Sequence, residues 1–373
     1  MLYYDAVTIG LRILQSEGQT LRQVTIVAND IGGRNGLRLL GEFLEKQGIA
    51  VCWYLGSGDA ISTSFGLTER IANSDAVICG MSSSEKLAAP EIMAANMAQQ
   101  LGVPFCLFAD SFNAHLKPYF NKWLYKAAAL MVLNSAEAQK AREHLKDVKV
   151  VATGNPAWEK FFFPRFTREE VRDRLTIPED CFVILSPGTK ELVVNVLLWG
   201  GLLDAATPLD NALVLASVHP DDQSPIEEYD KLADWSNGRL QVVVSDRDDP
   251  ESMTGSNMLP GADAVVDCCS TIAIEAACQR IPVITYAPEA AQIRRKKNGG
   301  SRAWEPAEMG ITQFRDGLKA VYNLACDLRS IAVREFNLVK RKQEEFFPLY
   351  PKPGETVKKM AAVIADIIGS REA

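Results

Sequence analysis

The stretch GADAVVDCCSTIAIEAACQRIPVITY, residues 261–286, predicts the fold of the chain. Its apolar run 264–269 has the length of a buried strand, residues 271–279 indicate a short Ala-rich helix, and 281–286 indicate a second buried strand. Two apolar strands joined by a helix favour a parallel pair with a right-handed crossover. The turn at Ser270 then lies at the carboxyl end of its strand, where open α/β sheets bind ligands.

This turn carries residues that suit an anion. Ser270 stands at the expected N-cap of the helix, whose free N–H groups and positive dipole end favour negative charge. Thr271 and Glu275 are four residues apart and therefore share one helix face. Such a set could hold a phosphate and the diol of a ribose. It is equally compatible with a serine cap and a glutamate that only favours the helix dipole, so both interpretations stay open.

Length and composition limit the remaining choices. A chain of 373 residues is too long for one ordinary core, so we expect two domains. The net charge of −7 argues against nucleic acid as a partner, and the basic run at 294–297 is interpreted as a solvated loop. No apolar stretch has the length of a membrane span, although peripheral membrane contact stays open. No basic leader accompanies MLYYDAV, so we expect a cytoplasmic protein.

The eight cysteines indicate no metal centre. None of them forms a C-x-x-C pair, and most lie inside apolar runs typical of strands. We therefore expect no zinc site and buried free thiols in a reducing compartment.

The first half of the chain shows a βα rhythm after an amphipathic helix predicted over 2–17. The strand 24–30 leads into the glycine-rich turn 31–36, where glycine lets the backbone approach a ligand closely. The spacing is not G-x-G-x-x-G, so the dinucleotide fingerprint is absent. Gly33 is therefore as compatible with a structural turn as with a binding turn.

Acidic residues end two predicted strands of this half. Asp30 ends the first strand, Asp110 ends the strand 103–110, and His115 follows in the next loop. Active sites of parallel sheets are built at such strand ends, so these residues are candidates for proton transfer.

The βα rhythm restarts at 182–188 after a charged and aromatic link at 159–180. We therefore expect an α/β protein with two doubly wound, Rossmann-like parallel-sheet domains that face each other across a cleft. The expected divisions are 1–165 for an N-terminal acceptor-side domain, 166–350 for a C-terminal nucleotide-binding domain, and 351–373 for a C-terminal helix that packs back toward the first domain.

Four stretches, taken in order, resemble the GT-B fold of nucleotide-sugar glycosyltransferases and of non-hydrolysing UDP-N-acetylglucosamine 2-epimerases. They are VTIVANDIGGRNGLRLLGEFLEKQGIAV (24–51), VVATGNPAWEKF (150–161), ASVHP (216–220) and ADAVVDCCSTIAIEAACQRIPVITY (262–286). Each motif is short, and the ordered set covers most of the chain. The resemblance is specific for the fold more than for the reaction.

The resemblance implies roles for the candidate residues. By position, Ser270 and Thr271 would hold a diphosphate and Glu275 a ribose. His219 would lie near the sugar or the diphosphate.

By the same resemblance, Gly188, Thr189 and Lys190 would form the first turn of the C-terminal domain, with Lys190 acting on the leaving diphosphate. The epimerases carry an Asp-Ser-Gly-Gly-like run where this chain has residues 268–271, and an Arg–Glu pair where it has Lys190 and Glu191. These departures are nearer to the serine–threonine version of envelope glycosyl- and glycerophosphotransferases.

The function that the resemblance implies is transfer of a sugar, or a related group, from a nucleotide donor such as a UDP-sugar to an acceptor hydroxyl, as in polysaccharide biosynthesis. Helix N–H groups and a lysine can neutralise the diphosphate without a metal ion or a further cofactor. Asp110 or His115 would serve as general base. A UDP-sugar 2-epimerase-like isomerase and a catalytically silent domain with an assembly or regulatory role remain as alternatives. The acceptor and the oligomeric state are open.

Overall fold

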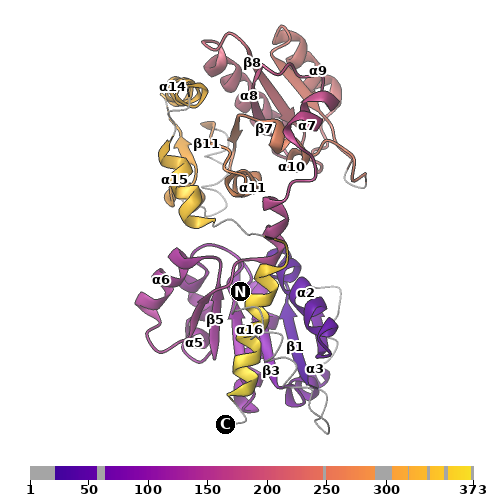
Figure 1. Ribbon diagram of the computed structural model, residues 1–373, viewed down its shortest axis with the longest axis vertical. Helices are drawn as coiled ribbons and strands as arrows, with labels where there is room; N and C mark the ends of the chain where they lie inside the picture. Colours follow the sequence, from indigo (N-terminus) through magenta and orange to yellow (C-terminus); the bar gives the residue numbers. More distant parts are fainter. Residues whose placement is uncertain are drawn as a thin grey trace. The chain divides into compact units, whose positions relative to one another are not determined.

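The computed structural model describes residues 22–56, 64–246, 249–289, 305–317, 319–333, 337–347 and 352–370. The helix predicted over 2–17 and the basic run at 294–297 lie outside these ranges. The chain divides into two compact units, which are Met1–Lys160 with Tyr350–Ala373, and Phe161–Leu349. Each unit has a six-stranded parallel sheet flanked by helices (Figure 1), so the predicted α/β class with two doubly wound sheets is confirmed.

The first unit has the strand order β2-β1-β3-β4-β5-β6. Its strands are β1 (Gln23–Ala28), β2 (Ala50–Leu55), β3 (Ala76–Gly80), β4 (Phe105–Phe108), β5 (Ala129–Val132) and β6 (Val150–Ala152). Its helices are α2 (Ile31–Lys46), α3 (Ser64–Ala72), α4 (Glu85–Gln100), η1 (Ala114–Leu116), η2 (Pro118–Phe120), α5 (Asn121–Leu124), α6 (Ser135–His144) and α16 (Glu355–Gly369), with η3 (Pro156–Phe162) at the link.

The C-terminal helix α16 belongs to the core of the first unit. Met360 and Ile364 are fully buried in one apolar cluster with Val24 of β1 and with Leu37 and Leu40 of α2. Figure 1 shows α16 in yellow beside the indigo and purple elements of this unit. Burial of such side chains stabilises the packing by about 1.5–3 kcal/mol each.

The second unit has the order β12-β11-β10-β7-β8-β9. Its strands are β7 (Phe182–Pro187), β8 (Ala212–Ser217), β9 (Leu240–Val243), β10 (Ala264–Asp267), β11 (Val283–Tyr286) and β12 (Gln313–Arg315). Its helices are α7 (Arg168–Arg174), α8 (Leu192–Ala206), α9 (Ile226–Trp235), α10 (Gly255–Met258), η4 (Leu259–Gly261), α11 (Ile272–Cys278), α13 (Glu305–Glu308), α14 (Ala320–Ala332) and α15 (Asn337–Phe346). The predicted strand–helix–strand over 261–286 is present as β10, α11 and β11, and the two strands pair in parallel.

Both sheets reverse their winding direction once. In the first unit the chain runs from β1 outward to β2 and then returns to the other side of β1 at β3. In the second unit it runs from β7 through β8 to β9 and returns to the other side of β7 at β10. Loops at the carboxyl ends of the strands diverge at such reversals, and ligands of open α/β sheets bind there.

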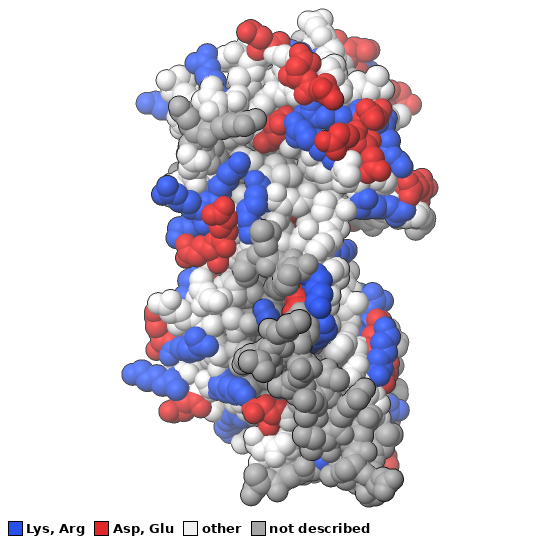
Figure 2. Space-filling model, viewed as in Figure 1, with Lys and Arg blue, Asp and Glu red and all other residues white. Residues whose placement is uncertain are grey.

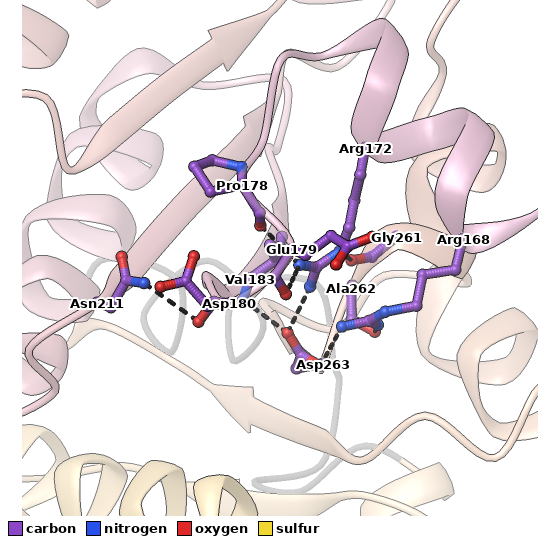
Figure 3. Close-up of polar contacts among 10 residues, drawn as sticks. All are labelled: Arg168, Arg172, Pro178, Glu179, Asp180, Val183, Asn211, Gly261, Ala262 and Asp263. Atoms are coloured by element: carbon purple, nitrogen blue, oxygen red, sulfur yellow. Dashed lines mark hydrogen bonds and ion pairs between the residues drawn. The ribbon is translucent and has the colours of Figure 1, made fainter.

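A buried ion-pair network fixes the amino edge of the second sheet (Figure 3). The Arg172 side chain is 5% exposed and lies 2.9 Å from Asp263 Oδ2, and it also donates to the carbonyl oxygens of Pro178, Glu179 and Gly261. Arg168 pairs with the other oxygen of Asp263 at 2.6 Å. A guanidinium stays charged when it is buried and is strongly destabilising without such partners, so this network anchors α7 to the sheet.

The surface and the thiols complete the description. On the face in Figure 2, acidic and basic side chains lie interspersed over both units. All eight cysteines are free. Four are buried, while Cys326 is exposed. Over the ranges described above, no helix combines the length and the apolar character needed to cross a bilayer.

Candidate functional site

Three turns of the second unit meet at the carboxyl edge of its sheet. They follow β10, β7 and β8, which are neighbours and run parallel. The candidate residues in these turns are Gly188, Thr189, Lys190, His219, Ser270 and Thr271. The sheet reverses its winding between β7 and β10, so the turns after these two strands diverge there. The structure thus brings the candidates to the edge at which open α/β sheets bind ligands.

A buried asparagine ties the turn after β7 to the turn after β8. Asn195 of α8 has 0% exposure, accepts a hydrogen bond from Thr189 N–H at 2.6 Å and donates to Asp222 Oδ2 at 3.0 Å. Gly188 packs closely beneath this tie, because a Cβ there would lie 3.0 Å from Ser217 O, a tighter contact than is usual. The sequence did not single out Asn195 as functional. The available signal was one amide inside the otherwise apolar run of α8.

Lys190 and His219 both turn toward Asp221. Lys190 Nζ lies 2.7 Å from Asp221 Oδ2, and the lysine side chain is 57% exposed. An exposed pair of this kind contributes little to stability, so an anionic ligand can compete for the ammonium. His219 Nδ1 accepts the N–H of Asp221 at 3.0 Å, which leaves the ring proton on Nε2 as a donor.

The turn after β10 is held from below by Asp267. Its fully buried carboxyl accepts the N–H of Ser270 at 2.5 Å and the hydroxyl of Thr285 at 2.8 Å. Burial raises the pKa of Asp267 to about 7, and these hydrogen bonds oppose the rise. Cys269 has φ of 60°, so the chain turns sharply just before Ser270.

The helix after this turn starts one residue later than expected. Thr271, and not Ser270, is the N-cap of α11, and its side chain makes no capping hydrogen bond. Ser270 Oγ instead accepts from Ile272 N–H at 3.4 Å. Thr271 is exposed and Glu275 is half-buried one turn further along α11, so the two share the face that the sequence predicted.

In the first unit, hydrogen bonds join the loops after β1 and β3. Asp30 caps α2 by accepting from Ile31 N–H at 2.8 Å, and its second oxygen accepts from Ser83 N–H at 3.0 Å. The backbone N–H of Asp30 donates to Ser82 Oγ at 3.0 Å. Burial would raise the pKa of Asp30, but the hydrogen bonds from Ser83 and Ile31 and the charge of Lys117 lower it below its ordinary value.

Glu91 of α4 lies completely buried behind these loops. Its Oε1 accepts from Ser82 Oγ at 2.5 Å and from Asn29 N–H at 2.9 Å, whereas Oε2 is buried with no hydrogen-bond partner among the described residues. Burial raises the pKa of Glu91, against the effect of these bonds. No sequence pattern distinguishes this glutamate, because it lies in the middle of an Ala-rich helix.

Asp110 lies just beyond β4 and against the first turn of α2. A Cβ on Gly32 would lie 2.3 Å from Asp110 Oδ2, so any larger residue there would displace the Asp110 carboxyl, whereas a Cβ on the buried Gly33 would lie at an ordinary 3.9 Å from that carboxyl. Within the described ranges, no other residue donates a hydrogen bond to the carboxyl of Asp110. Burial raises its pKa to about 6, Lys117 opposes the rise, and Asp30 adds to it.

Lys117 is a second residue of this site that the sequence did not reveal. Its Nζ donates to Met81 O at 2.5 Å and to Ser111 Oγ at 3.2 Å. Burial lowers the pKa of Lys117, and the nearby carboxyls of Asp110 and Asp30 oppose this shift. A lysine in an irregular loop before a proline has no pattern that distinguishes it from a solvated one.

The structure directs His115 toward a different part of the first unit. Its ring is 5% exposed and its centroid lies 5.8 Å from that of His144 on α6. Burial lowers the pKa of His115, and the charge of Glu137 on the same helix opposes the shift. The structure therefore brings Asp110 next to Gly33, whereas His115 packs against α6. The charges that act most on Asp110 belong to Lys117 and to carboxyl groups, and not to His115.

The two edges differ in chemistry. The second unit offers hydroxyls, a lysine and an imidazole N–H, which are donors suited to an anion. The first unit offers the carboxyl of Asp110, whose pKa of about 6 is close to neutral pH, beside further carboxyls and one ammonium. This arrangement suits proton transfer. Over the described ranges, no cluster of three or more His, Cys, Asp or Glu side chains is arranged to hold a metal ion.

Comparison with known proteins confirms the GT-B fold. No protein-family model and no curated protein matches the sequence. A putative UDP-N-acetylglucosamine 2-epimerase from Listeria monocytogenes is similar in structure with a TM-score of 0.58 and 13% identity, over 95% of this chain and 98% of that chain. A glycosyltransferase from Rickettsia africae gives 0.54 and 14%, over 94% and 99%. A ugt transferase from Siraitia grosvenorii in complex with UDP gives 0.56 and 12%, over 93% and 100%.

Proposed function

We propose that this chain is a glycosyltransferase that takes a sugar, or a related group, from a nucleotide donor such as a UDP-sugar and transfers it to an acceptor hydroxyl. The observation that carries the proposal is the set of hydrogen-bond donors at the winding reversal of the second sheet. They come from three neighbouring parallel strands and are the side chains of Lys190, His219, Ser270 and Thr271.

The donor nucleotide is assigned to the second unit. Ser270 and Thr271 supply hydroxyls for the diphosphate, and Glu275 supplies a carboxylate for the ribose diol. Lys190 exchanges its exposed partner Asp221 for the diphosphate. The diphosphate gains charge as the bond to the anomeric carbon breaks, so a cation there stabilises the transition state more than the ground state. These groups supply the positive charge without a metal ion.

Proton transfer is assigned to Asp110 of the first unit. A general base works best when its pKa lies near the operating pH, and burial brings Asp110 to about 6. The acceptor oxygen forms a bond to the anomeric carbon, its proton passes to Asp110, and the nucleoside diphosphate leaves with the electron pair of the broken bond.

A UDP-sugar 2-epimerase-like isomerase is the second candidate. The observation in its favour is the gathering of Asp30, Glu91 and Asp110 in one part of the first unit. Isomerisation at a sugar carbon moves protons without an acceptor, and several carboxyl groups suit that task. A similar fold in an epimerase from Listeria monocytogenes is compatible with this alternative.

The decisive experiment follows a labelled nucleotide-sugar panel with and without candidate acceptors. Nucleotide release that requires an acceptor supports the transferase, and an isomerised donor without acceptor supports the epimerase. Binding without turnover indicates a silent domain, and the absence of any nucleotide binding contradicts the proposal as a whole. Binding is read from the rise in melting temperature, because a ligand of the native state stabilises it.

Single substitutions test the assignments separately. Glu275→Ala should weaken donor binding by about 1–3 kcal/mol, whereas Glu228→Ala on the surface of α9 should leave it unchanged. Lys190→Ala should lower kcat at least about 10-fold. Asp110→Asn should depress transfer while donor affinity stays nearly intact. Native donor affinity in a folded Glu275→Ala protein would remove the ribose assignment.

A further inference from the structure

Lys117 is held rigidly between two loops of the first unit. Its ammonium donates to the Met81 carbonyl oxygen, in the loop after β3, and to Ser111 Oγ, in the loop after β4. A second clamp closes the same two loops, since Tyr119 OH donates to Ser82 O at 2.9 Å. A lysine restrained by two hydrogen bonds has lost most of its rotamer freedom, so its charge has a fixed place.

That fixed charge faces a group of carboxyls. The loop after β3 accepts Lys117 at Met81 O, and through Ser82 Oγ it also bonds to the backbone of Asp30 and to the carboxyl of Glu91. Asp110 lies against Gly32 in the first turn of α2, directly after Asp30. Lys117, Asp30 and Glu91 are accordingly the charged side chains that act most on Asp110. Among these three, Lys117 is the cation. Asp30 accepts two backbone hydrogen bonds and Glu91 accepts two at Oε1, so both are satisfied by groups other than Lys117.

We propose that Lys117 is a positioning residue whose fixed ammonium keeps Asp110 ionised at neutral pH against the two neighbouring carboxyl groups. The proposal rests on the proposed function only for its catalytic consequence, which is that Asp110 is ready to accept a proton. The electrostatic relation between Lys117 and Asp110 can be tested whether or not the chain transfers sugar.

The expected effect has a definite sign. A nearby opposite charge lowers the pKa of a carboxyl by about 1–3 units. Loss of the ammonium should therefore move the titration midpoint of Asp110 upward from about 6 by at least about one unit. A carboxyl with that midpoint is protonated in at least about half of the molecules at neutral pH, and those molecules lack the base.

The experiment is a carbon-detected NMR titration of protein labelled at the aspartate carboxyl carbons. The Asp110 signal is assigned by its loss in Asp110→Asn. Lys117→Met should raise the midpoint by about one unit or more, and Lys117→Arg should restore most of the native value because it keeps the charge. Lys122→Met is the matched control, since Lys122 lies over the ring of Trp123 in the next helix and the net charge changes equally.

The outcomes separate this inference from the proposed function. An unchanged Asp110 midpoint in folded Lys117→Met overturns the inference. If Lys117→Met does not fold, Asp30→Asn tests the same group of charges with the opposite sign. Removal of the like charge of Asp30 must lower the titration midpoint of Asp110, and an unchanged midpoint overturns the inference. The acidic limb of the kcat/KM pH profile should shift with the midpoint in Lys117→Met. If the midpoint of Asp110 moves while the acidic limb of the pH profile stays in place, Asp110 is not the base and Lys117 has no positioning role.

Discussion

Replacing Asp110 by Asn should stabilise the first unit at neutral pH while it depresses transfer. The carboxyl is half-buried, receives no hydrogen bond from another described residue and has a pKa raised to about 6 by burial. An ionised carboxyl in such a place costs free energy that an amide of the same shape does not. Asn therefore removes a destabilising charge without breaking a contact within the described ranges.

The magnitude follows from the pKa of Asp110. Its ordinary value is 3.8, so the folded state raises it by about two units, and each unit corresponds to about 1.4 kcal/mol. The upper bound is therefore about 3 kcal/mol, and partial solvent screening reduces it to about 1–2 kcal/mol.

The dependence on pH has a fixed sign. Because the folded state binds this proton more tightly than the unfolded state, stability falls as the pH rises from about 4 to about 6 and then stays at its lower value. The advantage of Asp110→Asn should be near zero at about pH 4 and reach its full size above about pH 6.

Hydrogen exchange read by mass spectrometry is the suitable assay, because a chain of two units need not unfold in one step. Peptides from β1, β3 and β4 report the opening free energy of the first unit at each pH. Asp147→Asn, an exposed carboxyl of the same unit, is the control and should show no gain. A gain equally large at about pH 4 and about pH 7.5, or no gain at about pH 7.5, would refute the reasoning.

Three further predictions concern residues outside the proton-transfer group. Arg172→Met should lower the free energy of unfolding of the second unit by about 3–5 kcal/mol, because it leaves Asp263 without its buried partner. Arg174→Met on the same helix should change this free energy little, because its pair with Glu251 is exposed, and denaturant unfolding of both variants compares them. Glu159→Gln should loosen α16, because the carboxylate accepts the N–H groups of Gly354 and Thr356 at its start, and exchange in α16 should quicken by the equivalent of about 1–2 kcal/mol. Asn195→Leu should weaken donor binding about 10-fold, measured by calorimetry, by leaving Thr189 N–H unpaired; native affinity would show that this tie does not shape the site.

The sequence by itself determined the fold class, because its signals are local. Short, mostly apolar runs such as 264–267 and 283–286 favour buried strands of a sheet covered on both faces, and the helix between them favours a parallel crossover. The same reasoning placed Ser270 at a strand end, and the resemblance to GT-B proteins pointed to Lys190 and His219 at two others. Position along the chain was enough to place such residues at one edge, since the carboxyl ends of all strands in a parallel sheet lie at the same edge.

Tertiary structure alone decided which side chains meet. Asp30 and Glu91 come to Asp110 because β3 lies between β1 and β4, and Lys117 joins them because the loop after β4 bonds to the loop after β3. No local pattern records that choice of neighbour. His115 is only five residues beyond Asp110 and equally plausible by sequence, yet the loop after β4 turns its ring to α6. In the sequence Asn195 is only one amide in an apolar helix, and the structure shows that it hydrogen-bonds to the turns after β7 and β8. Charges and hydrogen bonds act through space over a few ångströms, so the chemistry of a site depends on distances that the winding of the sheet creates and that sequence spacing does not encode.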